Sequence, residues 1–309
     1  MTFQQFSGIV ELRTKIVSMS TLFLATLYTV WQTGRLDLLS FLLLFFAALA
    51  VDMGTTGFNT YFDFLRGVDH PEYNREQSKV LVHEGVRPQA ALAVSVACFG
   101  AAAILGAAIA FRSGWPVILA GGASMAVGFL YTGGPLPISR TPLGEIFAGG
   151  FLGTVFFLVI YYVLGGSRDI PNLLRAFLAS LPSAFFIASI LTTNNTCDIE
   201  GDRAAGRHTL SILIGRPASA ALIYVEGALG FLMAAAWVVV GILPIPILPA
   251  VGIATALSAL VYRWMHSSGY SHDTKQKSMG GISRVFLLYS AAFCLGILAD
   301  LLIRQPYRI

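Results

Sequence analysis

The sequence predicts an all-α integral membrane protein, a single bundle of about nine transmembrane helices. Charged residues make up 12% of the 309 residues, about half the share usual in soluble globular chains, whereas the hydrophobic set makes up 56%. So few charges cannot cover the surface of a water-soluble fold of this size. Apolar windows of about 20 residues, long enough to cross a hydrocarbon core, recur along the whole chain. We therefore expect residues 1–309 to form one membrane domain.

Nine apolar windows are candidate spans. In order, they cover about 16–32, 38–59, 89–111, 115–131, 143–164, 173–194, 218–240, 243–263 and 284–303. The fourth is short and rich in glycine, and the eighth opens with Pro244, Pro246 and Pro249, which predicts a kinked or late-starting helix. Small residues at three- and four-residue spacing in the third and fifth windows predict close helix packing in lipid.

The distribution of positive charge predicts the orientation. Of the 20 Lys and Arg residues, 14 fall on the side of the N-terminus and six on the other side. This places the N-terminus in the cytoplasm and the chain in the cell (inner) membrane. The connections at about 60–88, 195–217 and 264–283 all lie on that inner side, and connections that long usually carry function. Because the charges lie in loops between apolar runs, the net charge of +4 does not indicate nucleic-acid binding.

Two similar polar motifs stand in two of these inner connections. Asn59 and Asp63 recur 135 residues later as Asn194 and Asp198, and Asp202 extends the second motif by four residues. Residues spaced by four share one face of a helix, so each motif presents its side chains in one direction. Four spans separate the copies, which puts both on the same side of the membrane. The sequence therefore predicts a pseudo-symmetric bundle with two acidic motifs facing each other.

These motifs favour a metal and diphosphate site. Carboxylates of like charge repel one another, and at a membrane boundary they need a neutralising partner. Mg²⁺ binds through one or two carboxylates and completes its shell with water and phosphate oxygens. Arg66 stands beside the first motif, and Arg203 and Arg207 stand beside the second, where guanidinium groups could bind phosphate oxygens. The alternative interpretation is that these residues are solvated charges at helix ends. Two such motifs on the same side of the membrane, each with arginines beside it, argue against that alternative.

Three segments carry a family resemblance. They are Asn59 to Asp69, Tyr131 to Pro137 (Tyr-Thr-Gly-Gly-Pro-Leu-Pro) and Asn194 to Leu210. Along nearly its whole length the chain resembles the UbiA superfamily of membrane aromatic prenyltransferases. The three segments are most similar to the branch that prenylates 1,4-dihydroxy-2-naphthoate in menaquinone synthesis. Two departures are Thr60, where many members have aspartate, and Arg13-Thr14-Lys15, where an Arg-Pro pair is common.

The resemblance implies a reaction and assigns roles to residues. A polyprenyl diphosphate would bind with Mg²⁺ between the two motifs, its allylic C–O bond would ionise, and the ring of an aromatic acceptor would attack the allylic cation. In the naphthoate branch the attacked carbon loses CO₂. The implied metal ligands are Asn59, Asp63, Asp69, Asn194, Asp198 and Asp202, the implied diphosphate ligands are Arg66, Lys79, Arg140, Arg203 and Arg207, and Tyr131 would contact the acceptor. Asp63 and Asp198 are the implied catalytic residues.

Asp52 is a further candidate catalytic residue, because it lies inside the second span on the same helical face as Asn59. A carboxylate within the membrane is a functional candidate, here as a proton acceptor or as a group that orients the acceptor. The alternative is a buried acid that is hydrogen-bonded to a neighbouring helix. Other functions also stay open: prenylation of another acceptor such as 4-hydroxybenzoate, or secondary transport. Transporters, however, hold their coupling carboxylates near the membrane midplane rather than beside arginines at helix ends.

The spacing of the first motif makes a further structural prediction. On a continuous helix, six residues would rotate Asp69 by about 240° away from Asp63. Both can face one diphosphate only if the helix ends near Gly67 and the chain turns back, which glycine permits. We expect residues 67–88 to become ordered when Mg²⁺ and prenyl diphosphate bind.

Overall fold

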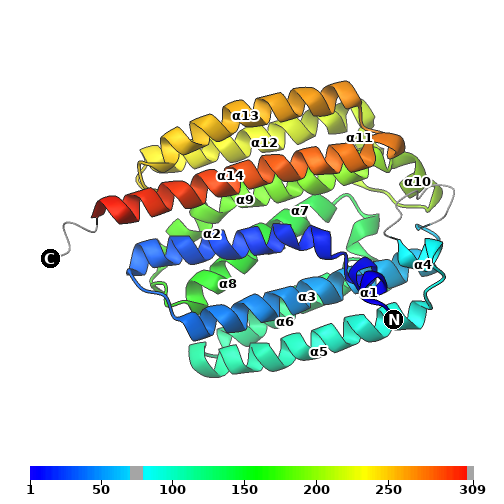
Figure 1. Ribbon diagram of the computed structural model, residues 1–309, viewed down its shortest axis with the longest axis horizontal. Coiled ribbons are helices and arrows are strands. Elements are labelled where there is room, and N and C mark those ends of the chain that lie inside the picture. Colours follow the sequence, from blue (N-terminus) through cyan, green and yellow to red (C-terminus); the bar gives the residue numbers. More distant parts are fainter. Residues whose placement is uncertain (70–78, 305–309) are drawn as a thin grey trace.

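The computed structural model describes residues 1–69 and 79–304, and these residues form a helical bundle without strands. The long helices run along one another through the length of the molecule (Figure 1). They are α2 (Ile16–Thr33), α3 (Leu38–Leu65), α5 (Pro88–Ser113), α6 (Pro116–Leu130), α9 (Ile170–Cys197), α12 (Arg216–Val239), α13 (Ile247–Ser268) and α14 (Lys275–Arg304). A further rod joins α7 (Gly144–Ala148), the π-helical segment η3 (Gly149–Val155) and α8 (Phe156–Val163).

The all-α membrane fold is confirmed, but the count of nine spans is not. In the described part of the chain, seven helices are long and apolar enough to cross a membrane. Helix α6 has only 15 residues, and α2 has 18 residues but carries several Ser and Thr side chains that lower its hydropathy. The eighth predicted helix starts late, at Ile247, as its prolines indicated. The last helix begins at Lys275 rather than near residue 284.

Glycines set two close helix contacts. A Cβ added to Gly153 of η3 would lie 2.5 Å from the Cα of Ala184 in α9, so no larger residue fits there. Close packing by the fifth predicted span is therefore confirmed. The third predicted span, α5, also packs closely, against α3, but its own glycines do not make the contact, because a Cβ at Gly100 or Gly106 meets no atom within 4 Å. The glycines at the contact between α3 and α5 are instead Gly54 and Gly57 of α3, where an added Cβ would lie 2.3 Å from Phe99 and from Ser95 respectively.

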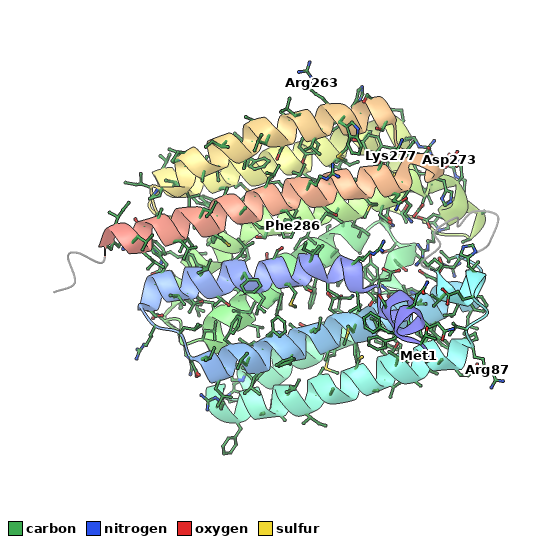
Figure 2. The ribbon with its side chains drawn as sticks, in the orientation of Figure 1. Met1, Arg87, Arg263, Asp273, Lys277 and Phe286 are labelled. Carbon is green, nitrogen blue, oxygen red and sulfur yellow. The ribbon has the colours of Figure 1, made fainter. Side chains whose placement is uncertain are left out.

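Short helices gather at one end of the bundle. These are α1 (Phe3–Val10), α4 (Val80–His83), α10 (Ile199–Ala204) and α11 (Leu210–Ile214). The N-terminus lies at this end, and α14 finishes at the opposite end (Figure 1). Figure 2 shows Arg87, Asp273 and Lys277 near this end and Phe286 farther inside the bundle. Of the loop expected to become ordered with ligand, residues 70–78 lie outside the described residues.

Candidate active site

The first acidic motif sits where α3 ends. The helix stops at Leu65, and Gly67 adopts a φ of +69° in the left-handed region. The backbone N–H groups of Val68 and Asp69 then donate to the carbonyl of Asp63 at 2.9 and 3.2 Å. The predicted turn at Gly67 is confirmed. It returns the buried Asp69 toward Asp63 instead of leaving it on the far side of the helix.

The second motif spans a junction between two helices. Helix α9 ends at Cys197, α10 begins at Ile199, and Asp198 caps both with non-helical backbone angles. The expected continuous helix is thus interrupted. The four-residue repeat nevertheless continues, because Asp198 N–H donates to Asn194 O at 3.1 Å and Asp202 N–H donates to Asp198 O at 2.8 Å.

One arginine connects the two motifs. Arg207 donates from Nη2 to Asp63 Oδ1 at 2.7 Å and from Nη1 to Asp202 Oδ1 at 3.0 Å. Only 10%, 17% and 4% of the three side chains are exposed, in the order Arg207, Asp63 and Asp202. The motifs separated by 135 residues therefore face each other across a single guanidinium group.

Burial and charge shift the pKa values of this bridge. Burial raises the pKa of Asp202 to about 6, although the charge of Arg207 opposes that effect. Burial lowers the pKa of Arg207, but the charges of Asp63 and Asp202 more than offset it and raise its pKa above the usual value. The second oxygen of Asp202, Oδ2, is buried without a hydrogen-bond partner. Asp202 thus has an oxygen available for another ligand.

Two lysines neutralise the remaining acids. Lys275 of α14 contacts Asp198 Oδ2 at 2.7 Å, and His272 Nδ1 lies 3.6 Å from Asp198 Oδ1. Lys79 lies 3.5 Å from Asp69 Oδ2 and 3.0 Å from Oε1 of Glu11. Burial raises the pKa of Asp69, and the charge of Lys79 acts against that rise. Of these neighbours, the sequence analysis had named Lys79 as a site residue but missed Lys275, His272 and Glu11. The signal that could have pointed to Lys275 was its place in a long inner connection.

Arg66 holds a neighbouring segment rather than an acid. Its guanidinium donates to the carbonyls of Thr132 and Gly134, the latter at 2.7 Å. The Thr132 hydroxyl in turn donates to Asn59 Oδ1 at 2.8 Å. The Tyr131 to Pro137 segment, singled out in the sequence, is therefore fixed against the end of α3.

The other two predicted arginines have different surroundings. Arg140 donates from Nη2 to the carbonyl of Ala205 at 2.6 Å, and its own carbonyl accepts from the N–H of His208. It thereby positions the chain that follows α10. Arg203 is exposed on α10, at the same end of the bundle.

A cavity of about 590 Å³ extends from the acidic end into the bundle, between α2, α3, α5, α6, α8 and α9. Asn59, Asn194 and Tyr131 line it at the acidic end. Along α3 the lining runs from Asn59 to Leu44, about 22 Å at the helical rise. Most of the other lining residues are apolar. A polar, charged site thus joins a long apolar chamber.

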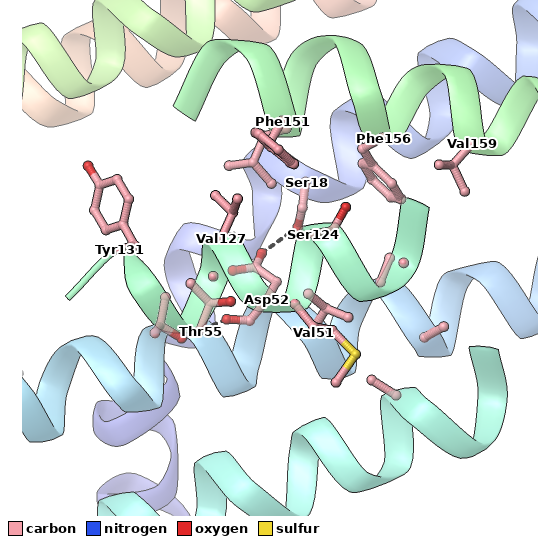
Figure 3. A pocket seen from close by; sticks show the side chains of 18 of the residues that line it. Ser18, Val51, Asp52, Thr55, Ser124, Val127, Tyr131, Phe151, Phe156 and Val159 are labelled. Atoms are coloured by element: carbon pink, nitrogen blue, oxygen red, sulfur yellow. Dashed lines mark hydrogen bonds between the residues drawn. The ribbon is translucent and has the colours of Figure 1, made fainter. Parts of the chain in front are cut away.

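Asp52 lines this chamber as part of a polar cluster. Its Oδ1 accepts from Lys15 Nζ at 2.6 Å, and its Oδ2 accepts from Ser18 Oγ at 2.5 Å (Figure 3). Lys15 also donates to Thr56 Oγ1 at 2.9 Å. The side chain of Lys15 is only 5% exposed and that of Asp52 17% exposed. Asp52 is therefore bonded to the N-terminal turn of α2 and also borders the cavity.

Comparison with known proteins identifies related sequences. Residues 18–292 match the UbiA prenyltransferase family. The 1,4-dihydroxy-2-naphthoate octaprenyltransferase of Bacillus subtilis is 39% identical over 205 residues, which cover 66% of this chain and 63% of that protein. The human UbiA prenyltransferase domain-containing protein 1 is 33% identical over 174 residues, 55% of this chain and 48% of that protein. The matched region thus spans between about half and 63% of the length of these two relatives.

Solved structures share the fold. A UbiA homologue from Archaeoglobus fulgidus bound to GPP and Mg²⁺ superposes with a TM-score of 0.66 at 16% identity, over 95% of this chain and 99% of that one. A UbiA homologue from Aeropyrum pernix K1 gives a TM-score of 0.65 at 19% identity, over 95% and 98% of the two chains. At such identities the likeness concerns the fold alone.

Proposed function

The chain belongs to the UbiA prenyltransferase family, and from that premise we propose that it transfers a polyprenyl group from a polyprenyl diphosphate to 1,4-dihydroxy-2-naphthoate, with loss of CO₂, as a step of menaquinone synthesis. The observation that carries this proposal is the Arg207 bridge between Asp63 and Asp202, at the end of an apolar chamber. A prenyl diphosphate has the same division into a highly charged head and a long apolar tail. The similarity to the Bacillus subtilis enzyme supports the naphthoate as acceptor.

The site residues fit Mg²⁺. The donors are the carboxylate oxygens of Asp63, Asp69, Asp198 and Asp202 and the amide oxygens of Asn59 and Asn194, which are hard oxygen ligands. The partnerless, buried Oδ2 of Asp202 is one ready donor. In the described residues no three acidic, His or Cys side chains already surround a common point. Mg²⁺ commonly binds through one or two carboxylates and completes its shell with water and phosphate oxygens, which each motif could provide, and bound Mg²⁺ would stabilise the charge of the leaving diphosphate.

The cations beside the acids supply the anion-binding groups. Arg207 and Lys275 each contact a carboxylate of the second motif, and Lys79 contacts Asp69. Guanidinium and ammonium groups bind phosphate oxygens through charge-assisted hydrogen bonds. We propose that these three side chains exchange a carboxylate for a diphosphate oxygen, and that the exposed Arg203 adds a further contact. Arg66 and Arg140 act one step away, by holding backbone segments of the site.

The apolar chamber suits the reactive part of the substrate. An allylic cation reacts with water, so a lining of mostly apolar side chains protects it until the aromatic ring attacks. Tyr131 borders the chamber beside Asn59, where the allylic carbon of a bound diphosphate would lie. We propose that its ring packs against the acceptor there.

The charge distribution supports an orientation of the chain in the membrane. The chain is a multi-pass integral membrane protein by its apolar helices and its family. We propose that the acidic end faces the cytoplasm of the cell membrane, because 14 of the 20 Lys and Arg residues lie on that side of the predicted spans.

Mass spectrometry of reaction products tests the proposed function. Purified protein in detergent is incubated with Mg²⁺, a polyprenyl diphosphate and a panel of aromatic acid acceptors. We expect a prenylated naphthoquinol that lacks the carboxylate, and no product from the Asp63→Asn variant, which keeps the side-chain shape but loses a negative ligand. Prenylation of 4-hydroxybenzoate but not of the naphthoate would move the protein to another acceptor class. No prenylated product from any acceptor would refute the proposal.

A further inference from the structure

A buried ion pair in the chamber wall lies outside the proposed metal and diphosphate site. The ammonium of Lys15 is 2.6 Å from Asp52 Oδ1 and also donates to the Asp52 carbonyl at 3.2 Å and to Thr56 Oγ1 at 2.9 Å. Ser18 donates to the other carboxylate oxygen. Such a cluster within an apolar bundle is costly to form, since both charges leave water. Asp52 and Ser18 also line the cavity, so a molecule bound there could contact the cluster.

The position of Asp52 relative to the acidic end is set by α3. Asp52 precedes Asn59 by seven residues, two helical turns, so both side chains lie on the same face about 10 Å apart along the axis. Both line the same cavity, and Tyr131 lines it at the Asn59 end (Figure 3). A fused aromatic ring placed between them can reach Asp52 with one ring substituent while its reacting carbon faces the diphosphate end.

Facing walls of the chamber are mostly apolar. Phe151 and Phe156 project from the η3–α8 rod toward the cavity, and Val51 and Val127 border it near Asp52 (Figure 3). A hydroxyl group of an acceptor in this chamber therefore finds its strongest polar partner at Asp52. Each carboxylate oxygen can accept more than one hydrogen bond, so the bonds from Lys15 and Ser18 leave capacity for a further donor.

We propose that Asp52 accepts the proton of an acceptor hydroxyl group during prenyl transfer, with Lys15 and Ser18 fixing the orientation of its carboxylate. This assignment rests on the proposed function. The ammonium of Lys15, 2.6 Å from Oδ1, supplies the opposite charge that a carboxylate in an apolar chamber needs, and the Ser18 hydroxyl fixes Oδ2. Lys15 and Ser18 are thus positioning residues, and Asp52 is the group that touches the acceptor.

The proton moves from the acceptor hydroxyl to Asp52 while the new C–C bond forms. A π electron pair of the ring forms the new C–C bond to the allylic carbon, whose C–O electron pair has left with the diphosphate. Positive charge then develops on the ring, so the hydroxyl becomes a strong acid. Its O–H electron pair forms a C=O bond, and the proton passes to Asp52. With the naphthoate, the C–COO⁻ bond breaks, its electron pair restores the aromatic ring and drives the C=O pair back onto oxygen, CO₂ leaves, and the oxygen recovers the proton from Asp52. No oxidant or further reactant is needed.

A weak base suffices because the hydroxyl acidifies only as the ring attacks. General-base assistance of this kind typically contributes about 10²–10⁴-fold to a rate. Asp52→Asn keeps the side-chain shape and can still accept from Ser18, but it cannot take a proton. We expect its turnover with acceptor at saturating prenyl diphosphate to fall by at least about 100-fold. The dissociation constant for geranyl diphosphate with Mg²⁺ should stay within about twofold of the wild-type value.

Asp300→Asn is the matched control. Asp300 is also a buried acid, paired with Arg304 at 2.6 Å and accepting from Trp31 Nε1 at 2.7 Å. It lies near the end of α14, far from the chamber mouth. Arg304 is 54% exposed, so this variant tests the loss of a buried, ion-paired and hydrogen-bonded carboxylate outside the chamber, and we expect near-normal turnover.

Acceptor acidity separates a base from a structural or orienting role. The ratio of wild-type to Asp52→Asn turnover is measured for the acceptor that the wild type uses and for a ring-fluorinated analogue whose hydroxyl is already ionised at the assay pH. A base role predicts that the ratio falls toward one with the ionised analogue, which has no proton to give. Equal ratios for both acceptors, or near-normal turnover of Asp52→Asn, would overturn the assignment.

Two further arms keep the outcome decisive. If Asp52→Asn does not accumulate, Ser18→Ala is compared with the wild type instead, because it leaves the ion pair intact. A loss of turnover of about tenfold that shrinks with the ionised analogue supports the assignment. No loss of turnover, or a loss that is equal for both acceptors, opposes it. If the wild type prenylates no hydroxylated aromatic acceptor, the proposed function itself fails. If the wild type is active and Asp52→Asn turns over at a near-normal rate, only the role of Asp52 is refuted.

Discussion

Replacement of Arg207 by methionine tests whether one guanidinium group holds the two acidic motifs together. The variant keeps a long apolar stem but leaves Asp63 and Asp202 facing each other without the positive charge that now lies 2.7 and 3.0 Å from their oxygens. Removing one partner from a buried ion pair costs about 3–5 kcal/mol, because the remaining charge is left uncompensated. We expect Arg207→Met to lower the stability of the metal-free protein by about 3 kcal/mol at pH 8.

The loss should depend on pH and on metal. Because the pKa of Asp202 is already about 6, protonation below pH 6 removes its charge, relieves its repulsion with Asp63 and reduces the effect of the substitution. Mg²⁺ can replace the missing positive charge, and in the variant it no longer competes with Arg207 for the carboxylates. Mg²⁺ should therefore stabilise the variant more than it stabilises the wild type.

Apparent melting temperature in detergent measures both effects. Wild type, Arg207→Met and a control are compared at pH 8 and pH 5, with and without Mg²⁺. The control is Arg112→Met, since Arg112 pairs with Asp37 at 2.8 Å but both side chains are about 40% exposed. An exposed pair of this kind contributes about 0–1 kcal/mol. A variant as stable as the control, or one that Mg²⁺ stabilises less than the wild type, would refute the reasoning.

Three further predictions concern the same end of the bundle. Asp202→Asn should raise the metal-free melting temperature at pH 8 and abolish turnover. The pKa of Asp202 in the folded protein, about 6, lies above the ordinary aspartate value of 3.8, so the ionised carboxylate costs up to about 3 kcal/mol above pH 6, and the gain in stability should shrink as pH falls from 6 toward 4. A gain that grows on acidification would contradict this. Gly67→Ala should lower activity and destabilise by about 1 kcal/mol, because its φ of +69° strains a residue with a Cβ although no atom crowds it, whereas Gly67→Asn should be tolerated better. An Ala205→Cys variant should react with a membrane-impermeant thiol reagent only from the cytoplasmic side, and labelling only from outside would reverse the proposed orientation.

Local sequence patterns were sufficient for the helices and for the turn at Gly67. Apolar windows located the start of α3 and both ends of α9 to within three residues, because a span must satisfy its backbone hydrogen bonds internally, whereas α3 extends six residues beyond its window to Leu65. The six-residue offset between Asp63 and Asp69 predicted where α3 ends, since the helical rotation is fixed. The predicted count of nine spans was not confirmed in the described residues, because α2 is marginal in hydropathy and α6 in length.

The site divides in the same way. By itself the sequence determined which acids lie at the ends of α3 and α9 and that they share one side of the membrane, because the helical repeat and the parity of the spans are local or additive properties. Only the tertiary structure decided the partner of each charge: Arg207 bridges both motifs, Lys275 reaches Asp198 from a distant helix, Lys15 pairs with Asp52, and Arg66 binds backbone carbonyls. In the sequence, several Lys and Arg residues could equally well pair with each acid. Which one forms the bond depends on how helices tens to more than a hundred residues apart pack against each other, and no local spacing encodes that.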